Sequence, residues 1–422
     1  MSDWRETPLS RLASFQKGRK VDTSPFPQEG FQRYLGASGL AGGDDGYANE
    51  NLAVIAKCSD TLMLWDGERS GFVGYGQEGV VASTVSKLSP VESVHPKYLY
   101  YALASHFEWI QHRRTGTGVP HVPKDLGRIL KLRVPQSLQA QKRIAAVLSC
   151  IDAAVETTEA LIAKHQRIKS GLMHDLFARG VLPNGQLRPR LSEAPELYQQ
   201  TTVGWIPSDW QLAGLQAKSR AGISWIRTGP FGSALKGEHW RTHGYPVITI
   251  GALGEGEFLT QELLFVDSKD AARLREFQLR AGDVVFSRVA DVGRSVVIRE
   301  QHAGWIMSSN LMRIALDPDL VRPDYLQMQL AGDSRIKAQI RAQVNSGGRD
   351  VANSAVLSRL RFAWPDPNEQ DRIISRVLLT ERALQAERRA AEKLQKQKLG
   401  LMQDLLTGRV SVEHLAPELA SA

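Results

Sequence analysis

The sequence predicts an α+β protein, in which two α+β domains are separated by two long antiparallel coiled-coil helices with pseudo-two-fold symmetry. Three observations predict this fold class. The phrase GLMHDLFARGV at 171–181 returns as GLMQDLLTGRV at 400–410, and the residues before each phrase have a coiled-coil period. The long regions that precede these segments carry short β-like runs broken by turns. A repeat at a fixed offset indicates tandem duplication.

The duplication extends well upstream of the repeated phrase. At a constant offset of 229 positions, the agreements include Gln141/Gln370, Arg143/Arg372, Ile144/Ile373, Lys169/Lys398, Gly171/Gly400, Leu172/Leu401 and Met173/Met402. Weaker echoes lie outside these segments: SDW at 2–4 and 208–210, HPKYLYYAL at 95–103 with RPDYLQMQL at 322–330, and LKLRVP at 130–135 with LRFAWP at 360–365. Each half is therefore a long variable region followed by one similar segment.

Each similar segment is predicted to be one long helix with an apolar seam. Its seam residues alternate in steps of four and three, which is the period of a coiled coil. They are Ile144, Leu148, Ile151, Val155, Thr158, Ile162, His165, Lys169, Leu172 and Leu176 in the first copy, and Ile373, Val377, Thr380, Leu384, Glu387, Ala391, Leu394, Lys398, Leu401 and Leu405 in the second. Pro135 and Pro365 precede the helices, and Gly180 and Gly408 lie near their ends, as start and stop signals. Because a helix of this length cannot bury its own stripe, the expected partner is its duplicate.

We expect the repeated segments to provide helix–helix contacts and a docking surface for partners. The residues proposed for this are Ile144, Leu148, Ile151, Gly171, Leu172, Met173, Ile373, Val377, Leu384, Gly400, Leu401 and Met402. A glycine inside a helix costs about 1 kcal/mol. The recurrence of Gly171 and Gly400 beside Leu-Met therefore suggests the hypothesis of a close backbone approach between helices. The polar seam positions are interpreted as solvated breaks, or alternatively as residues that fix register or meet a third helix.

The variable regions have a different texture. Runs such as YPVITI at 245–250 and DVVFSRV at 283–289 are typical of strands, and glycine-rich turns separate them. The predicted organisation is one α+β domain at 1–135, a central long helix at 136–182, a connector at 183–204, a second α+β domain at 205–365, a distal long helix at 366–410 and a tail at 411–422.

Composition limits the function classes. The chain of 422 residues has 42% hydrophobic and 23% charged residues, which is ordinary for a soluble globular protein of two or three domains. No apolar run approaches the 18 residues of a membrane helix, and the start MSDWRETPLS is unlike a secretion signal. Two cysteines provide neither a disulfide framework nor a set of zinc thiolates. A cytoplasmic location is expected, and the net charge of +8 favours a polyanionic partner.

A search for catalytic motifs finds none that has its required context. GYGQEG at 74–79 fits GxGxxG, but the following VVASTV indicates a strand, whereas a dinucleotide site needs a helix there. His239 and His243 would align as ligands only on a helix, and Gly244 and Pro246 favour a surface loop. No catalytic residue and no metal ligand is therefore proposed. The sequence does not indicate an enzyme.

The arrangement resembles the specificity subunit of type I restriction-modification systems. The resemblance covers essentially the whole chain and is carried by TGPFGSALKGEHWRTHGYPVITIGAL at 228–253, AGDVVFSR at 281–288, NSGG with LSRLRFAWP at 345–365, and both helical segments with QKRI or QDRI and GLMxDL. The first variable region departs from this pattern. We align its DTSPFPQEG with TGPFGS, and its SDTLMLW with GDVVFSR. A shared fold is expected, but contact residues cannot be transferred from one region to the other.

The resemblance implies a non-catalytic subunit that recognises DNA. Each variable domain would be a target-recognition domain that reads one half of a bipartite, asymmetric site in double-stranded DNA. The helices would space the halves and dock two modification subunits, and restriction subunits would complete the complex. This chain would hold no cofactor, while S-adenosylmethionine, ATP and Mg²⁺ would belong to the partner subunits.

Basic residues are the candidates for DNA contacts, because phosphates hold register and side chains read base edges. In the first domain they are Lys17, Arg19, Lys20, Arg113 and Arg114, and in the second Lys236, Arg241, Arg288, Arg294 and Arg349. Two alternatives stay open. One is a specificity partner of a fused type II restriction-methyltransferase, and the other is a coiled-coil scaffold whose α+β domains bind protein.

Overall fold

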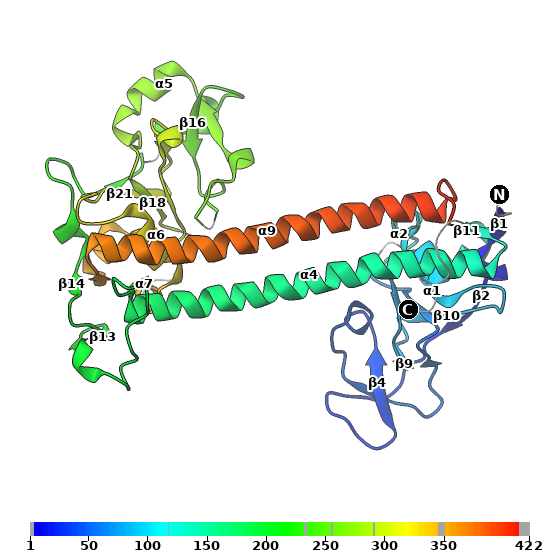
Figure 1. Ribbon diagram of the computed structural model, residues 1–422. Helices are drawn as coiled ribbons and strands as arrows, with labels where there is room; N and C mark the ends of the chain where they lie inside the picture. Colours follow the sequence, from blue (N-terminus) through cyan, green and yellow to red (C-terminus); the bar gives the residue numbers. More distant parts are fainter. Residues whose placement is uncertain are drawn as a thin grey trace. The chain divides into compact units, whose positions relative to one another are not determined.

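The computed structural model describes residues 4–412, apart from positions 117, 232–233, 255, 290–291 and 345–350. The chain divides into two compact units. Unit 1 comprises Met1–Leu161 with Glu387–Ala422, and unit 2 comprises Ile162–Ala386. Each unit therefore contains one variable domain and part of both long helices (Figure 1). None of the described helices has the length and apolar character needed to cross a membrane.

The two repeated segments are long helices, α4 at Leu138–Arg179 and α9 at Pro367–Leu406. Side chains cap both N-termini: Ser137 Oγ accepts the Ala140 N–H at 3.3 Å, and Asp366 Oδ1 accepts the Glu369 N–H at 3.1 Å. Gly180 and Gly408 follow the C-termini with φ of 68° and 71°, the left-handed conformation that ends helices. The predicted start and stop signals are confirmed.

Within unit 1, α4 and α9 lie antiparallel (Figure 1). Asp152 pairs with Lys398 at 2.7 Å, and Gln395 donates to Glu159 Oε1 at 3.3 Å. Residue numbers thus rise along α4 as they fall along α9. The side chains of Asp152 and Lys398 are each 31% exposed, so this ion pair is only partly solvated.

Within unit 2 the same arrangement recurs. Lys169 pairs with Glu381, and Arg372 Nε donates to the Val181 carbonyl at 3.1 Å. Lys169 and Lys398 are repeat equivalents, and so are Asp152 and Glu381, each 229 positions apart. The duplication therefore repeats the same ion pair between the helices in each unit. In unit 1 α4 provides the acidic residue and α9 the lysine, and in unit 2 α4 provides the lysine and α9 the acidic residue. Two of the polar seam positions fix register within the pair.

The predicted seam is confirmed in both helices. None of the twenty seam residues is exposed, and the buried ones are Ile144, Leu148, Leu176, Ile373, Val377, Leu384, Ala391 and Leu405. Both seams join larger cores within their own units. Ile144 and Leu148 pack with the first variable domain, and Ile373 and Val377 pack with the second.

The hypothesis of a close approach at the helix glycines is wrong for this chain. Gly171 and Gly400 are exposed, and a Cβ built on either one would meet no atom within 4 Å. Both glycines point away from the seam, so no backbone packs against them.

The variable domain of unit 1 is built on a sheet in the order β2–β10–β7–β8 and a second sheet in the order β3–β5–β4–β9–β6. A separate antiparallel pair joins β1 to β11, next to the start of α4. The bounds are β1 Trp4–Pro8, β2 Ala13–Lys17, β3 Thr23–Ser24, β4 Phe31–Leu35, β5 Tyr47–Asn49, β6 Ile55–Ala56, β7 Thr61–Leu64, β8 Val73–Tyr75, β9 Gly79–Val81, β10 Val85–Pro90, β11 Lys131–Pro135, α1 Pro96–Ala104, α2 Phe107–Gln111 and α3 Leu126–Ile129.

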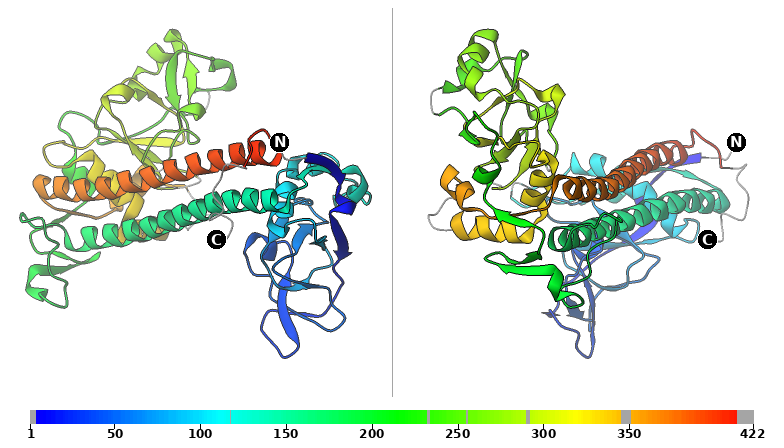
Figure 2. Two further views of the ribbon diagram at one scale, coloured as in Figure 1. Left: turned by 45° about the vertical axis from the view of Figure 1, so that its right-hand side comes forward. Right: turned by 60° about the vertical axis from the view of Figure 1, so that its left-hand side comes forward.

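The variable domain of unit 2 contains a sheet in the order β15–β21–β18–β19 and another in the order β17–β16–β20. Hairpin β12–β13 and pair β14–β22 lie apart from these sheets. The bounds are β12 Tyr198–Thr201, β13 Gly204–Pro207, β14 Gln211–Ala213, β15 Ile226–Thr228, β16 Tyr245–Ile248, β17 Leu264–Val266, β18 Val284–Ser287, β19 Ser295–Val297, β20 Ile306–Met307, β21 Leu311–Ile314, β22 Phe362–Trp364, α5 Ser268–Arg273, α6 Pro323–Gly332, α7 Ser334–Val344 and α8 Ser354–Arg359. In Figures 1 and 2 the β16 sheet lies farther from α9 than β18, β21 and α6 do.

The two domains share one topology, as expected. The order β2–β10–β7–β8 matches β15–β21–β18–β19, and the parallel pair β4–β9 matches the parallel pair β16–β20. Helices α1 and α6 are the two sequence echoes at 95–103 and 322–330, and each begins at a proline. The hydroxyl groups of Tyr98 and Tyr325 both donate to a backbone carbonyl of β11 or β22, at 2.9 and 3.1 Å.

The alignment of SDTLMLW with GDVVFSR is confirmed by a repeated turn. Asp60 Oδ2 accepts the N–H of Lys57 at 2.9 Å, and Asp283 Oδ2 accepts the N–H of Arg280 at 2.8 Å. Strand β7 or β18 begins at the next residue. Both aspartates are buried, so each turn depends on this side chain.

The alignment of DTSPFPQEG with TGPFGS is wrong. The structural counterpart of Gly229 is Gly18, in the segment KGRK. The N–H groups of Gly18 and Gly229 donate to Val85 and Leu311 at 2.9 and 3.0 Å. A Cβ would lie 2.1 Å from the Ala82 carbonyl oxygen at Gly18, and 1.9 Å from the Ser308 carbonyl oxygen at Gly229. Only glycine fits this crossing of backbones, and the proline-phenylalanine pair drew the sequence alignment to the wrong place.

Candidate nucleic-acid interface

The loop that follows the first strand of the four-stranded sheet, β2 or β15, leads to basic residues in both domains. Gly18 lies between Lys17 and Arg19, and the loop after Gly229 leads to Lys236 and Arg241. Because the two glycines are structural equivalents, these candidates occupy corresponding loops of the two domains. Basic residues of both loops were predicted as candidates from the sequence, but the alignment between the two regions was wrong.

In unit 1 the structure brings Lys17 and Arg114 to the same segment. Lys17 Nζ pairs with Asp66 Oδ2 at 2.9 Å, and Arg114 Nη1 donates to the Glu68 carbonyl at 2.7 Å. His121 Nδ1 lies 2.7 Å from Asp66 Oδ1. Lys17 and Arg114 are exposed, so two basic groups are presented to solvent and held by the segment 66–68.

The remaining candidates of the first domain are exposed as well. Arg113 lies over the Trp109 ring, with its guanidinium carbon 4.0 Å from the ring centroid. Arg19 Nη1 donates to the Leu52 carbonyl at 3.3 Å, which draws it toward another part of the domain than Asp66. Lys20 is exposed beside it.

In unit 2, Lys236 and Arg241 flank a short 3₁₀ turn. The Lys236 N–H donates to His239 Nδ1 at 2.9 Å, while the Lys236 side chain is exposed. Arg241 Nη2 pairs with Asp267 Oδ2 at 2.9 Å. The N–H of Asp270, and then Arg241, hold the pKa of Asp267 below its ordinary value. His239 belongs to a 3₁₀ turn at Gly237–His239 and His243 lies beyond it, so the two histidines do not share a helix.

Two arginine candidates of the second domain hold the domain together. Arg288 donates to the carbonyls of Ala352 and Ser309 at 3.2 and 3.3 Å, and Arg294 donates to Leu253 at 2.7 Å. Both are only partly exposed. Arg349 lies outside the described residues.

Sequence reasoning selected charged residues and missed exposed aromatic side chains. Phe26 is 72% exposed and Phe231 is 73% exposed, and each follows a proline. Large exposed aromatic rings can stack on nucleic-acid bases. Asp66 and His121 were also missed, because their proximity depends on a contact between segments 55 residues apart.

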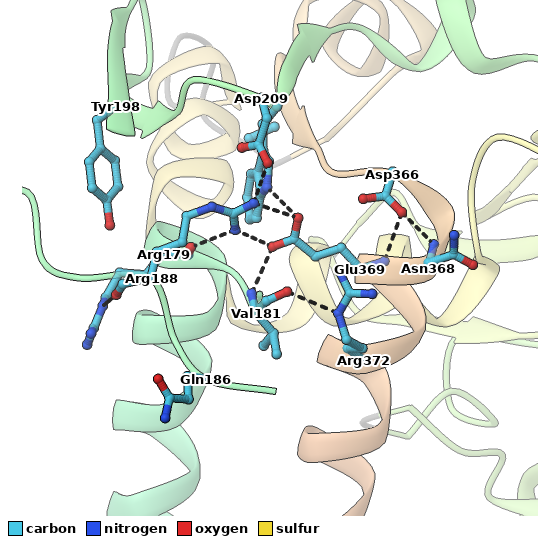
Figure 3. Close-up of polar contacts among 12 residues, drawn as sticks. Arg179, Val181, Gln186, Arg188, Tyr198, Asp209, Asp366, Asn368, Glu369 and Arg372 are labelled. Carbon is cyan, nitrogen blue, oxygen red and sulfur yellow. Dashed lines mark hydrogen bonds and ion pairs between the residues drawn. The ribbon is translucent and has the colours of Figure 1, made fainter. Parts of the chain in front are cut away.

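A buried ion pair ties the connector to the ends of both long helices in unit 2 (Figure 3). Arg188 forms a two-pronged ion pair with Glu369, and both side chains are almost fully buried. Glu369 also accepts the N–H of Val181 at 2.8 Å and the indole N–H of Trp210 at 3.1 Å. Arg188 in turn donates to the Arg179 carbonyl at 3.0 Å. Glu369 therefore joins the start of α9, the end of α4 and the entry to the second domain.

The repeated glutamine attaches each variable domain to its long helix. Gln141 donates to Pro135 at 3.0 Å and accepts the N–H of His95 at 2.7 Å. Gln370 donates to Pro365 at 3.0 Å and accepts the N–H of Arg322 at 2.7 Å. The sequence detected this repeat, but only the structure assigns it a role.

The docking candidates separate into two classes. Ile144, Leu148, Met173, Ile373, Val377, Leu384 and Met402 are buried within their units, and Ile151, Leu172 and Leu401 are partly buried. Gly171 and Gly400 are exposed. The buried members serve the internal seam and cores, whereas the glycines lie on faces that are open to another molecule.

The described part of the chain contains no group of three or more His, Cys, Asp or Glu residues arranged to hold a metal ion. The segment GYGQEG enters β9 at Gly79, as the strand interpretation predicts. The exposed groups described for the candidate interface are cationic and aromatic. Such groups suit contacts to phosphates and bases.

Comparisons with known proteins agree on one family. The family model described as the type I restriction modification DNA specificity domain matches residues 1–165. The type I restriction enzyme MjaVIII specificity subunit of Methanocaldococcus jannaschii is 23% identical over 98% of this chain and 94% of its own length.

Two solved structures have a similar fold. The S subunit of a type I restriction-modification system from M. genitalium matches with a TM-score of 0.59 and 16% identity, over 96% of both chains. A structure concerned with complex assembly and conformational transition of the type I restriction-modification system matches with a TM-score of 0.56 and 14% identity, over 96% of this chain and 98% of the other. Residues 1–165 thus match the DNA specificity domain of type I restriction-modification systems, and the whole chain is similar to specificity subunits of such systems.

Proposed function

We propose that this chain is the DNA-recognition subunit of a type I restriction-modification complex, with one half of a bipartite, asymmetric site read by each variable domain. One observation carries the proposal: two domains whose four-stranded sheets have the same strand order present different residues on corresponding loops. Lys17 and Arg19 flank the glycine of one loop, whereas Thr228 and Pro230 flank that of the other. A shared scaffold with different contact residues suits two unlike half-sites.

The long helices would set the spacing between the half-sites and dock two modification subunits. The register-fixing ion pairs in each unit support a stiff spacer. Restriction subunits would complete the assembly. S-adenosylmethionine, ATP and Mg²⁺ would belong to those partners, and this chain would take no catalytic part.

Mapping of modified adenines in the host genome, with and without this gene, tests the function. We expect two short motifs at a constant separation to lose their methylation together on deletion. Unchanged methylation would contradict the proposal. A specificity partner of a fused type II enzyme would give the same loss, and the neighbouring reading frames distinguish the two systems.

The scaffold alternative is tested by salt dependence. For a DNA-binding assembly, the logarithm of the affinity falls linearly with the logarithm of salt concentration, with a slope of about −0.9 for each neutralised phosphate. We expect a steep slope for the chain assembled with its modification subunits. No retention of DNA at low salt would favour a protein-binding scaffold.

A further inference from the structure

Unit 2 contains a strongly basic hollow that none of the candidate contacts uses. It has a volume of about 630 Å³, and its charged lining residues are Arg227, Arg275, Glu276, Arg280 and Arg313, here called the arginine pocket. This volume is within the range of small-ligand sites. The lining contains four arginines and one glutamate, so the pocket has a marked positive excess.

The centre of the pocket is an arginine pair on neighbouring strands. Arg227 of β15 lies directly opposite Arg313 of β21 in the antiparallel register. Like charges opposite each other destabilise a sheet. Glu276 neutralises Arg227 at 2.6 Å, but Arg313 has no such neighbour, since no carboxylate of the described residues lies within 4.0 Å of its guanidinium.

Arg313 is buried without a full set of partners. Its side chain belongs to a residue that is only 9% exposed. One Nη2 hydrogen bond goes to the Ser224 carbonyl at 2.9 Å, and its Nε is buried with no acceptor. A buried donor that lacks a partner is unfavourable, because it has lost its hydrogen bonds to water. This group is therefore placed to gain from an acceptor that enters the pocket.

Asp283 does not fill that role. Its Oδ2 accepts the Arg280 N–H at 2.8 Å, and its Oδ1 is buried without a partner. Burial raises the pKa of Asp283, and burial lowers the pKa of Arg313, while each charge partly offsets the shift of the other. The two groups interact across a separation too long for an ion pair.

The first domain places weaker groups at the equivalent positions. The shared register aligns Arg227 with Gln16, and Arg313 with Lys87. The repeated aspartate turn aligns Arg280 with Lys57. Lys87 Nζ donates to the Ile55 carbonyl at 3.0 Å, so its charge is directed to the backbone. Three of the four arginines therefore have no arginine at the aligned position of the first domain.

We propose that the arginine pocket binds a phosphate group of a nucleotide-sized ligand. Guanidinium groups present paired N–H donors that match phosphate oxygens, and several together favour a multiply charged anion. The phosphate can come from a DNA strand, a source that rests on the proposed function, or from a free nucleotide.

The test for phosphate binding uses the full-length chain and pyrophosphate as the probe. Thermal unfolding is measured with and without pyrophosphate, with sodium chloride matching the ionic strength. We expect pyrophosphate to raise the midpoint for the unaltered chain and for Arg341→Ala, an exposed charge-loss control on α7. Arg280→Ala and Arg313→Leu should lose this response. If Arg313→Leu fails to fold, the exposed Arg280 gives the result alone.

A second measurement identifies the source of the phosphate. In the complex with the modification subunits, Arg280→Ala should make the salt slope of DNA binding shallower by about one if the pocket holds a backbone phosphate. An unchanged slope together with a lost pyrophosphate response assigns the pocket to a free nucleotide. The proposal is overturned if both variants keep the pyrophosphate response, or if the unaltered chain shows no response and the slope is unchanged. Neither result would affect the methylation test of the proposed function.

Discussion

Single residues decide how the repeated helices connect to their surroundings. Glu369 has no counterpart in the first repeat, where Ala140 occupies the position 229 residues earlier. It is 1% exposed and gathers Arg188, Val181 and Trp210 around its carboxylate. The chain thus uses an ion pair where the connector must attach, and a small apolar residue where it need not.

Removal of Arg188 should destabilise unit 2 strongly. Arg188→Ala leaves the Glu369 carboxylate buried without its counter-ion, and breaking a buried pair in this way costs about 3–5 kcal/mol. Chemical denaturation of the full chain measures the loss. Arg190→Ala is the matched control, because Arg190 is exposed, and its effect should stay within about 0.5 kcal/mol. Similar losses for both variants would contradict this role.

His95 should make the stability of unit 1 dependent on pH. Burial, and then Lys142 and Lys97, lower its pKa below the ordinary value. The unfolded chain therefore binds a proton more readily than the folded chain does. As far as His95 is concerned, unit 1 has its full free energy of unfolding above about pH 6.5. This free energy decreases as the pH falls from there through the folded-state pKa of His95. His95→Gln should make the free energy of unfolding depend less on pH over this window. An unchanged pH profile in this variant would exclude the effect.

At the scale of elements, the long helices combine a strict internal seam with an open outer face. The helices are joined by the ion pair Lys398–Asp152 in unit 1 and by Lys169–Glu381 in unit 2, and these two pairs occupy equivalent positions of the repeat. The seam residues are covered in both helices, while Gly171 and Gly400 are exposed. The repeated glycines are therefore not explained by packing within the chain.

Alanine at the helix glycines should stabilise the isolated chain. Gly171→Ala and Gly400→Ala add a methyl group that meets no atom within 4 Å, and alanine is favoured over glycine in helices by about 1 kcal/mol. Denaturation midpoints test this expectation. If the glycines receive a partner subunit, as proposed, the same variants should weaken assembly. A loss of stability in the isolated chain would show an unseen contact.

At the scale of the molecule, two domains of equal topology are inserted between equivalent points of a duplicated helix. The β1–β11 pair adjoins α4 as the β14–β22 pair adjoins α9. Trp4 packs at Gly408 after α9, as Trp210 packs at Gly180 after α4. Each variable domain thus begins beside the end of one long helix and leads into the start of the other.

A domain replacement within the chain tests the division into two readers. Residues 5–134 placed where 211–364 stand would keep Trp210, Arg188 and Glu369, and would give two copies of one reader. On the proposed function, the methylated site should then consist of the first half-motif twice, in inverted orientation. Methylation mapping of a host that carries the altered gene reads this directly. Retention of the original second half-motif would contradict the assignment.

The sequence by itself determined the duplication, the α+β class, both long helices and all twenty seam positions. The seam could be predicted because the residues on one face of a helix recur at a fixed spacing, and this spacing is visible in the sequence. Only the tertiary structure decided that Gly18, rather than the proline-phenylalanine loop, corresponds to Gly229. It also decided that Arg288 and Arg294 are tied to backbone carbonyls, and that Arg227, Arg280 and Arg313 converge on one pocket. These facts depend on contacts between distant strands and loops, where side-chain charge alone does not reveal whether a group faces solvent, a carbonyl or another charge.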